Sequence, residues 1–147
     1  MSDPATRYLL DTDNVSYALR GDPAVVAHVA IVPLPNLVLS RITLAELSVL
    51  VHGRPARGRT QARLARLRTE HPFVDLDDAI WDRFADLKAA VVRTGRAPGV
   101  TGDFDTLQAA CALQHGLVLV TNNVRHFDLF AAHAGLVVEN WAQPAAP

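Results

Sequence analysis

The apolar positions along the chain follow two alternating patterns. Short continuous apolar runs, typical of buried strands, occur at 8–10, 37–40, 73–74, 117–120 and 136–138. Stretches with apolar residues three or four positions apart, typical of helices, occur near 15–19, 22–31, 42–51, 60–70, 78–93, 104–114 and 127–133. Because strands and helices alternate, the pattern predicts an α/β domain with a mainly parallel central sheet flanked by helices.

Length and composition support one globular domain. The chain has 147 residues, half of them apolar, and it contains no internal repeat. We expect a single domain over residues 1–142 and a frayed tail over 143–147, where the apolar pattern stops.

Several classes of protein are disfavoured. The formal net charge of −1 gives no global signal for nucleic-acid binding. The single cysteine, Cys111, excludes an intrachain disulfide and a cysteine-based zinc site. No signal-peptide pattern and no apolar run of membrane-spanning length is present, so a cytoplasmic protein without a membrane partner is expected.

Polar side chains follow three of the predicted strands. Asp11 follows the first strand, Ser40 the second, and the polar stretch 121–123 a later one. Because ligands of open α/β sheets bind beyond the carboxyl ends of the strands, we expect these groups to meet at one edge. Three further carboxylates lie at or near the starts of helices, namely those of Glu46, Asp103 and Asp105.

A cluster of carboxylates is costly unless a cation neutralises it. Oxygen-only ligands favour a hard ion, Mg²⁺ or Mn²⁺. Such an ion activates water and stabilises the charge that develops on a phosphodiester during hydrolysis. The pattern therefore predicts metal-assisted phosphodiester hydrolysis.

Helix capping and turn formation could also account for each of these acids. Residues 43–46 read Thr-Leu-Ala-Glu, a capping box in which Glu46 would satisfy a backbone amide. Asp103 and Asp105 could cap a helix or complement its dipole. Asp11 could belong to the turn over residues 11–14.

Four segments and a closing strand, taken in order, resemble the successive motifs of PIN-domain proteins, and specifically of the VapC toxins of bacterial toxin–antitoxin pairs. They are YLLDTD at 8–13, ITLAEL at 42–47, GDFDTLQAA at 102–110, LVTNNVRHF at 119–127 and LVVENW at 136–141. Each motif alone is weak, but the ordered set covers nearly the whole chain.

This resemblance implies a PIN fold and an endoribonuclease that depends on Mg²⁺ or Mn²⁺ and cleaves structured RNA, such as transfer or ribosomal RNA. It implies that Asp11, Glu46 and Asp105 are the catalytic acids that bind the metal. It also implies that Thr121 and Asn123 support metal-bound water or a neighbouring carboxylate. The expected partners are the RNA substrate, a second copy in a homodimer, and a VapB-type antitoxin that inserts a segment into the active-site groove.

The chain departs from the family pattern at several positions. Asp13, which we place with the residues supporting the metal ligands, stands where many relatives have Asn. Asp103 adds a carboxylate beside Asp105, and we expect it to share the catalytic work by positioning water together with Asn123. The fourth acidic position of the family is weak or absent, because Asn123 and His126 stand where some relatives have an acid. Gln108 occupies a position that is often apolar in the family.

Other functions remain compatible with the sequence. Arg41 and Arg96 are candidates for contacts to RNA phosphates. A catalytically silent PIN-like module that only binds RNA or a partner is the main alternative. A metal-dependent phosphatase or deoxyribonuclease could use the same carboxylates.

Overall fold

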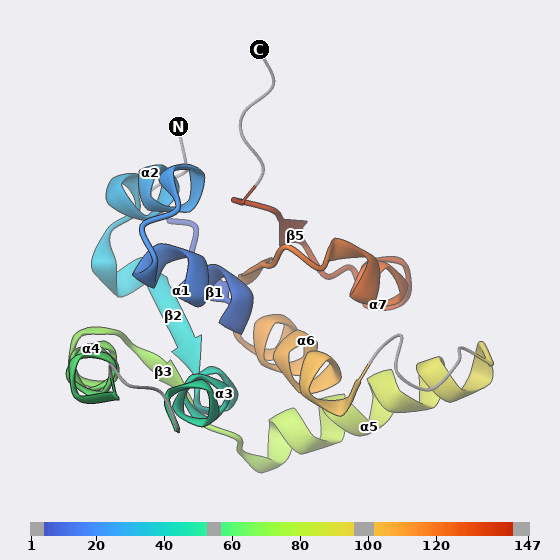
Figure 1. Ribbon diagram of the computed structural model, residues 1–147. Coiled ribbons are helices and arrows are strands. Elements are labelled where there is room, and N and C mark those ends of the chain that lie inside the picture. The colour runs from blue at the N-terminus through green and yellow to red at the C-terminus, as the bar shows by residue number, and fades with distance from the viewer. Residues whose placement is uncertain (1–4, 53–56, 96–101, 143–147) are drawn as a thin grey trace.

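The computed structural model describes residues 5–52, 57–95 and 102–142, which form one sheet and the helices packed on it (Figure 1). The strands are β1 (Tyr8–Leu10), β2 (Leu37–Ser40), β3 (Phe73–Val74), β4 (Val118–Val120) and β5 (Val138–Glu139). The α-helices are α1 (Thr12–Leu19), α2 (Pro23–Ile31), α3 (Arg41–Val51), α4 (Arg57–Glu70), α5 (Asp78–Arg93), α6 (Asp103–His115) and α7 (Asp128–Ala134). Two 3₁₀ helices are also present: Leu34–Asn36 lies between α2 and β2, and Val124–His126 lies between β4 and α7.

The sheet has the strand order β3-β2-β1-β4-β5, and all neighbouring strands are parallel. The predicted α/β class with a parallel central sheet flanked by helices is therefore confirmed. The first strand in the sequence lies at the centre, between β2 and β4. In such an order the carboxyl ends of β1, β2 and β4 are neighbours, and the crevice beyond them is the usual place for a ligand.

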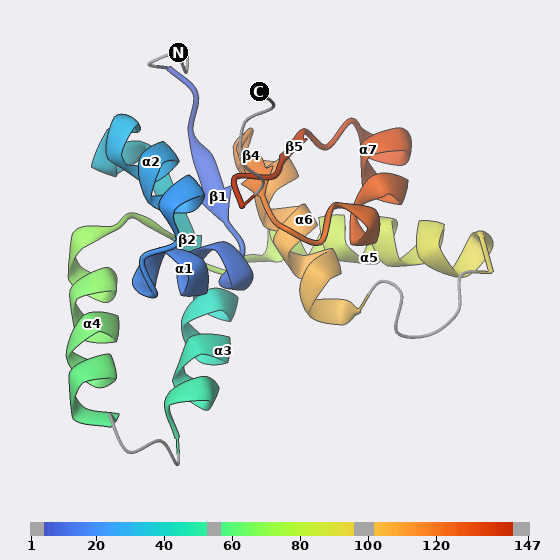
Figure 2. The same ribbon diagram turned by 45° about the horizontal axis from the view of Figure 1, so that its top comes forward.

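Alternate residues of the strands supply two separate hydrophobic cores. Leu9, Val38 and Leu119 face one core, which α5, α6 and α7 cover. Leu10 and Leu39 face the other, which contains residues of α1, α2, α3 and α4. Figure 2 shows these two groups of helices on opposite sides of the sheet. Both faces are buried, which explains why the strands are continuous apolar runs.

The predicted elements are present, with differences at their ends. Helix α1 begins at Thr12, three residues before the apolar pattern, because the side chain of Asp11 accepts a hydrogen bond from the Thr12 amide and caps it. Helix α6 ends at His115 and is capped by Gly116, whose φ of 61° is a left-handed conformation that favours glycine. The last strand covers Val138–Glu139, later than the expected 136–138. In the described part of the chain, no helix is long and apolar enough to cross a membrane.

Candidate active site

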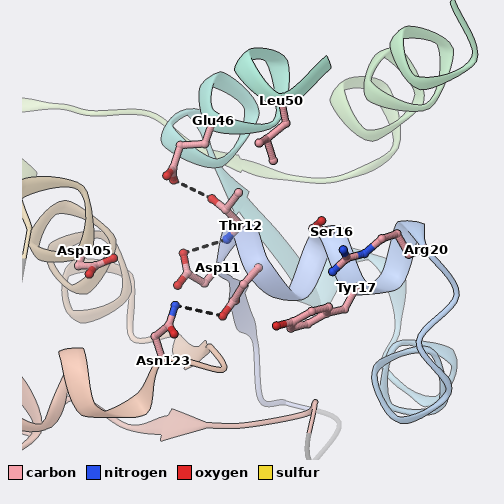
Figure 3. Close-up of a pocket in the computed structure, with 10 residues that line it drawn as sticks. Asp11, Thr12, Ser16, Tyr17, Arg20, Glu46, Leu50, Asp105 and Asn123 are labelled. Atoms are coloured by element: carbon pink, nitrogen blue, oxygen red, sulfur yellow. Dashed lines mark hydrogen bonds between the residues drawn. The ribbon is translucent and has the colours of Figure 1, made fainter. Parts of the chain in front are cut away.

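A pocket opens at the carboxyl edge of the central strands, with a volume of about 310 Å³ (Figure 3). Four carboxylates from three parts of the chain line it, those of Asp11, Asp13, Glu46 and Asp105. The other lining residues are Thr12, Ser16, Tyr17, Arg20, Leu50 and Asn123. The edge at which the sequence predicts a cluster of acids is thus the edge that holds the pocket.

Asp11 lies at the centre of the site, directly after β1, and only 6% of its surface is exposed. Its Oδ1 accepts hydrogen bonds from the Thr12 amide at 2.8 Å and from Gln108 Nε2 at 3.3 Å, and its Oδ2 accepts from Thr121 Oγ1 at 2.9 Å. Burial, followed by the charge of Asp13, raises the pKa of Asp11 to about 7, although the bonds from Thr12 and Thr121 oppose the shift. The protein therefore holds this carboxyl group where its negative charge is costly without a cation.

Glu46 reaches the pocket from the second turn of α3, where its Oε1 accepts a hydrogen bond from Thr12 Oγ1 at 2.7 Å. The capping-box interpretation of Glu46 is wrong, because α3 begins at Arg41 and its cap is Ser40. Ser40 Oγ accepts from the Thr43 amide at 3.2 Å, so no cap requires Glu46. Its carboxylate faces the start of α1 instead.

Asp103 and Asp105 share the first turn of α6 but point to different surroundings. Asp105 lines the pocket and is partly buried, with Oδ2 2.9 Å from Nδ1 of His126. Asp103 does not line this pocket; its side chain is 65% exposed and pairs with Lys88 Nζ at 2.6 Å. Neither residue caps the helix, since its N-cap is Gly102, but both complement the helix dipole.

The loop after β4 is tied to the start of α1. Asp13 Oδ2 accepts from the Asn122 amide at 2.9 Å and from Asn123 Nδ2 at 3.5 Å. The amide of Asn123 in turn donates to Thr121 Oγ1 at 3.1 Å. Asp13, Thr121 and Asn123 therefore brace the walls of the pocket around Asp11.

Gln108, to which the sequence pattern assigned no function, connects the elements that carry the acids. It is fully buried, on the inner side of α6. Its Nε2 donates to Thr43 Oγ1 at 2.8 Å as well as to Asp11, and its Oε1 accepts from Ser40 Oγ at 2.8 Å. A polar residue at an apolar position of the helix pattern was the available signal, because a buried amide needs hydrogen-bond partners.

Of the two arginines proposed for phosphate contacts, the structure describes only Arg41, and Arg41 does not line the pocket. Arg41 pairs with Asp75 at 2.9 Å and lies over the ring of Phe73, away from the pocket lining. Arg96 lies outside the described residues. Among the described residues, the cation that lines the pocket is Arg20, which no motif in the sequence singled out.

The residues of the pocket fit a divalent cation in their chemistry, because the donors are carboxylate oxygens and Asp11 is buried with no cationic partner in the part of the chain that the structure describes. Within residues 5–52, 57–95 and 102–142, no three carboxylate, imidazole or thiol groups are grouped closely enough to form a cage that could hold a metal ion. Mg²⁺ does not require such a cage, because it keeps several waters and uses one or two carboxylates together with substrate oxygens. An open pocket lined by acids suits that mode of binding.

Comparisons with known proteins agree with this architecture. Residues 8–132 match the family described as PIN domain. The chain is 32% identical to the VapC ribonuclease Y4jK of Sinorhizobium fredii, over 93% of this chain and 99% of that protein. It is 27% identical to the tRNA(fMet)-specific endonuclease VapC of Shigella flexneri, over 92% and 98%.

Solved structures of VapBC proteins have the same fold as this chain. The VapBC-1 structure from nontypeable Haemophilus influenzae aligns with a TM-score of 0.79 at 26% identity, over 94% of this chain and 100% of that one. VapBC2 from Rickettsia felis, bound to a DNA fragment from its promoter, aligns with a TM-score of 0.78 at 25% identity, over 92% and 99%.

Proposed function

The chain belongs to the PIN-domain family and resembles its VapC ribonucleases, and from this premise we propose that it is a magnesium-dependent endoribonuclease that acts as the toxin of a VapBC-type pair. One observation carries the proposal: Asp11, Glu46 and Asp105, from three separate elements, line a single pocket at the carboxyl edge of the sheet. A site of this kind needs a cation and has room for a phosphodiester beside it.

In the proposed mechanism, Asp11, Glu46 and Asp105 would hold the ion, directly or through its bound waters. Mn²⁺ is an alternative to Mg²⁺. When bound, the ion supplies a Lewis acid that activates water and stabilises charge on the phosphodiester. Asp11 accepts the hydrogen bonds that fix its orientation from Thr121, Gln108 and the Thr12 amide.

The contacts of the remaining acids refine their proposed roles. Thr12 Oγ1 orients Glu46, and His126 orients Asp105. Asp103, which the sequence placed among the catalytic residues, is assigned to its ion pair with Lys88 instead. Asn123 lines the pocket, so its position remains compatible with holding a water or the RNA.

The proposed substrate is structured RNA, of the transfer or ribosomal class. The Shigella flexneri relative, which is named a tRNA(fMet)-specific endonuclease, supports transfer RNA as the first substrate to test. Because transfer and ribosomal RNA work in the cytoplasm, we propose that the protein acts there.

The proposed partners are a VapB-type antitoxin and a second copy of this chain. The solved structures from Haemophilus influenzae and Rickettsia felis contain VapBC proteins, which supports a cognate antitoxin here. In the intact pair, the antitoxin would block the acidic pocket until it is removed.

The experiment that tests this function compares substrates under one set of conditions. Purified protein is incubated with Mg²⁺ and transfer RNA, ribosomal RNA, single- and double-stranded DNA, or a small phosphate ester. We expect discrete RNA fragments, their loss with EDTA, and no cleavage of DNA or of the ester. Cleavage of DNA or the ester in preference to RNA would refute the ribonuclease, and no cleavage of any substrate would favour a silent binding module.

A further inference from the structure

Arg20 stands on the wall of the acidic pocket as a cation among carboxylates. It is the C-cap of α1 and its side chain is exposed. Figure 3 shows Arg20 and Asp105 on opposite sides of the site, with Asp11 and Thr12 between them. Arginine binds phosphate through two parallel hydrogen bonds, so a guanidinium in this place has a clear candidate ligand in an RNA-cleaving pocket.

The side chain of Arg20 is supported by an aromatic ring and pairs with no acid of the described residues. Its guanidinium carbon lies 5.1 Å from the centre of the Tyr17 ring, a cation–π distance. The hydroxyl of Tyr17 is itself fixed, because Asn122 Nδ2 donates to it at 3.3 Å. Among the ion pairs of the described residues, none joins Arg20 to a carboxylate.

A second groove, of about 320 Å³, continues from the acidic pocket past Arg20. The two hollows share Ser16, Arg20 and Leu50 as lining residues. This groove is lined mostly by apolar side chains, but it also carries a second cation, Arg63, whose Nη1 donates to the carbonyl of Leu19 at 3.1 Å. A strand leaving the acidic pocket in this direction would therefore pass positive charge.

We propose that Arg20, braced on the ring of Tyr17, binds an RNA phosphate. This phosphate is the one next to the cleaved phosphodiester on the same strand. The inference rests on the proposed ribonuclease function and adds to it a residue, a contact and a direction for the strand. The carboxylates would hold the cation that acts on the cleaved phosphodiester, and Arg20 would hold the neighbouring phosphate so that the strand lies in register. Because Arg20 contacts backbone rather than bases, it contributes affinity without sequence preference.

The test uses Arg20→Gln and Arg20→Lys, with Arg7→Gln as a matched control. Arg7 is an exposed arginine before β1, at the opposite edge of the sheet, so its loss changes the net charge equally. The kcat and KM of RNA cleavage are measured at about 50 to 200 mM salt, the range over which binding through phosphate contacts weakens strongly. Mg²⁺ affinity is measured separately by calorimetry.

We expect Arg20→Gln to raise KM by roughly tenfold and to reduce the slope of log KM against log salt by about 0.7, the value for one contact on a single strand. Arg20→Lys should recover part of the affinity, because it keeps the charge but not the planar fork. Tyr17→Leu should raise KM in the same direction, since it removes the support of Arg20. Mg²⁺ affinity should not fall in any of these variants, because none of them removes a carboxylate and Arg20→Gln removes a positive charge that opposes cation binding.

Three results would overturn the inference. One is a KM and salt slope in Arg20→Gln equal to those of Arg7→Gln. Another is a loss of Mg²⁺ affinity in Arg20→Gln, which would assign the residue to the metal site. The third is weaker binding of the antitoxin with unchanged KM, which would make Arg20 a protein contact. If the wild-type protein cleaves no RNA, the proposed function itself fails, and this outcome is distinct from all three.

Discussion

At the scale of single residues, Asp11 sets the chemistry of the pocket. It is buried, it follows the central strand, and the charges of Asp13 and Asp105 add to the cost of its ionisation. Its three hydrogen bonds fix its orientation but do not offset that cost. The local turn that the sequence allowed is real, since Asp11 caps α1, yet a cap on the surface would not be buried in this way.

The pKa of Asp11 predicts how stability depends on pH without metal. A pKa raised from 3.8 to about 7 means that folding favours the protonated form. The stabilisation is therefore complete below pH 4 and is lost as pH rises to 7, at about 1.4 kcal/mol per pH unit. In EDTA, the unfolding free energy from urea titrations should fall by about 3 kcal/mol between pH 5 and pH 8 on account of this group.

The control for this pH dependence is Asp11→Asn, which cannot ionise at this position. Its unfolding free energy should vary less between pH 5 and pH 8 by that same amount, and Mg²⁺ should stabilise the wild-type protein at pH 8 but not the variant. Equal pH profiles for the two proteins would show that the raised pKa of Asp11 is wrong.

Asp103 and Asp105 form a natural pair of matched variants, two residues apart on one helix turn. Asp105→Asn should lower kcat for RNA by about 100-fold or more, the scale of losing one electrostatic contact to a transition state. Asp103→Asn breaks an exposed ion pair with Lys88 and should change kcat by less than about threefold. A larger loss in Asp103→Asn than in Asp105→Asn would reverse the assignment.

At the scale of elements, the apolar pattern located the strands and helices well but not their ends. The first turn of α1 is polar because Thr12 and Asp13 face the site, so the helix pattern begins late. Leu136 is apolar because it packs in a core beside β5, although the strand itself begins at Val138. Burial and strand pairing are separate properties, and only the first is visible in the hydrophobic pattern.

The sequence could indicate the acids of the candidate site, which follow a strand or lie near the start of a helix. It could not indicate the contacts that join residues from different elements. The order of motifs indicated Asp11, Glu46 and Asp105. It could not show that Lys88 engages Asp103, because the two residues belong to different helices. The same reason hid the bond between Ser40 and Gln108, which lie 68 positions apart in the sequence.

The contacts of Gln108 between elements predict that its loss lowers both stability and kcat. Gln108→Leu removes an amide that joins α6 to β1 and to α3, and leaves the polar groups of Asp11, Ser40 and Thr43 without that partner. We expect a loss of about 1–3 kcal/mol in unfolding free energy and a larger fall in kcat than destabilisation explains. The fall in kcat should arise because the positions of Asp11 and Asp105 are no longer coupled.

The control for Gln108→Leu is Leu87→Ala, which removes buried side-chain volume on α5, away from the pocket. It should cost about 2–5 kcal/mol but leave kcat nearly unchanged when measured well below the melting temperature. A normal kcat in Gln108→Leu would reduce Gln108 to a structural role.

At the scale of the whole molecule, the strand order places the acids together. Because β1 lies between β2 and β4, the residues that follow these strands share one edge, and α3 and α6 bring Glu46 and Asp105 to the same place. The two cores fix the helices against opposite faces of the sheet, so the pocket is framed from both sides (Figures 1 and 2). The fold makes an acidic site at the edge, and the proposed cation completes it.

The most direct test of this account is a time course of transfer-RNA cleavage by the wild-type protein and by Asp11→Asn, each with Mg²⁺ and with EDTA. Both proteins should be shown by circular dichroism to be folded before the comparison. The wild-type protein should cleave transfer RNA with Mg²⁺, and no cleavage should occur in the other three reactions. Cleavage by Asp11→Asn at the wild-type rate, or by the wild-type protein in EDTA, would contradict it.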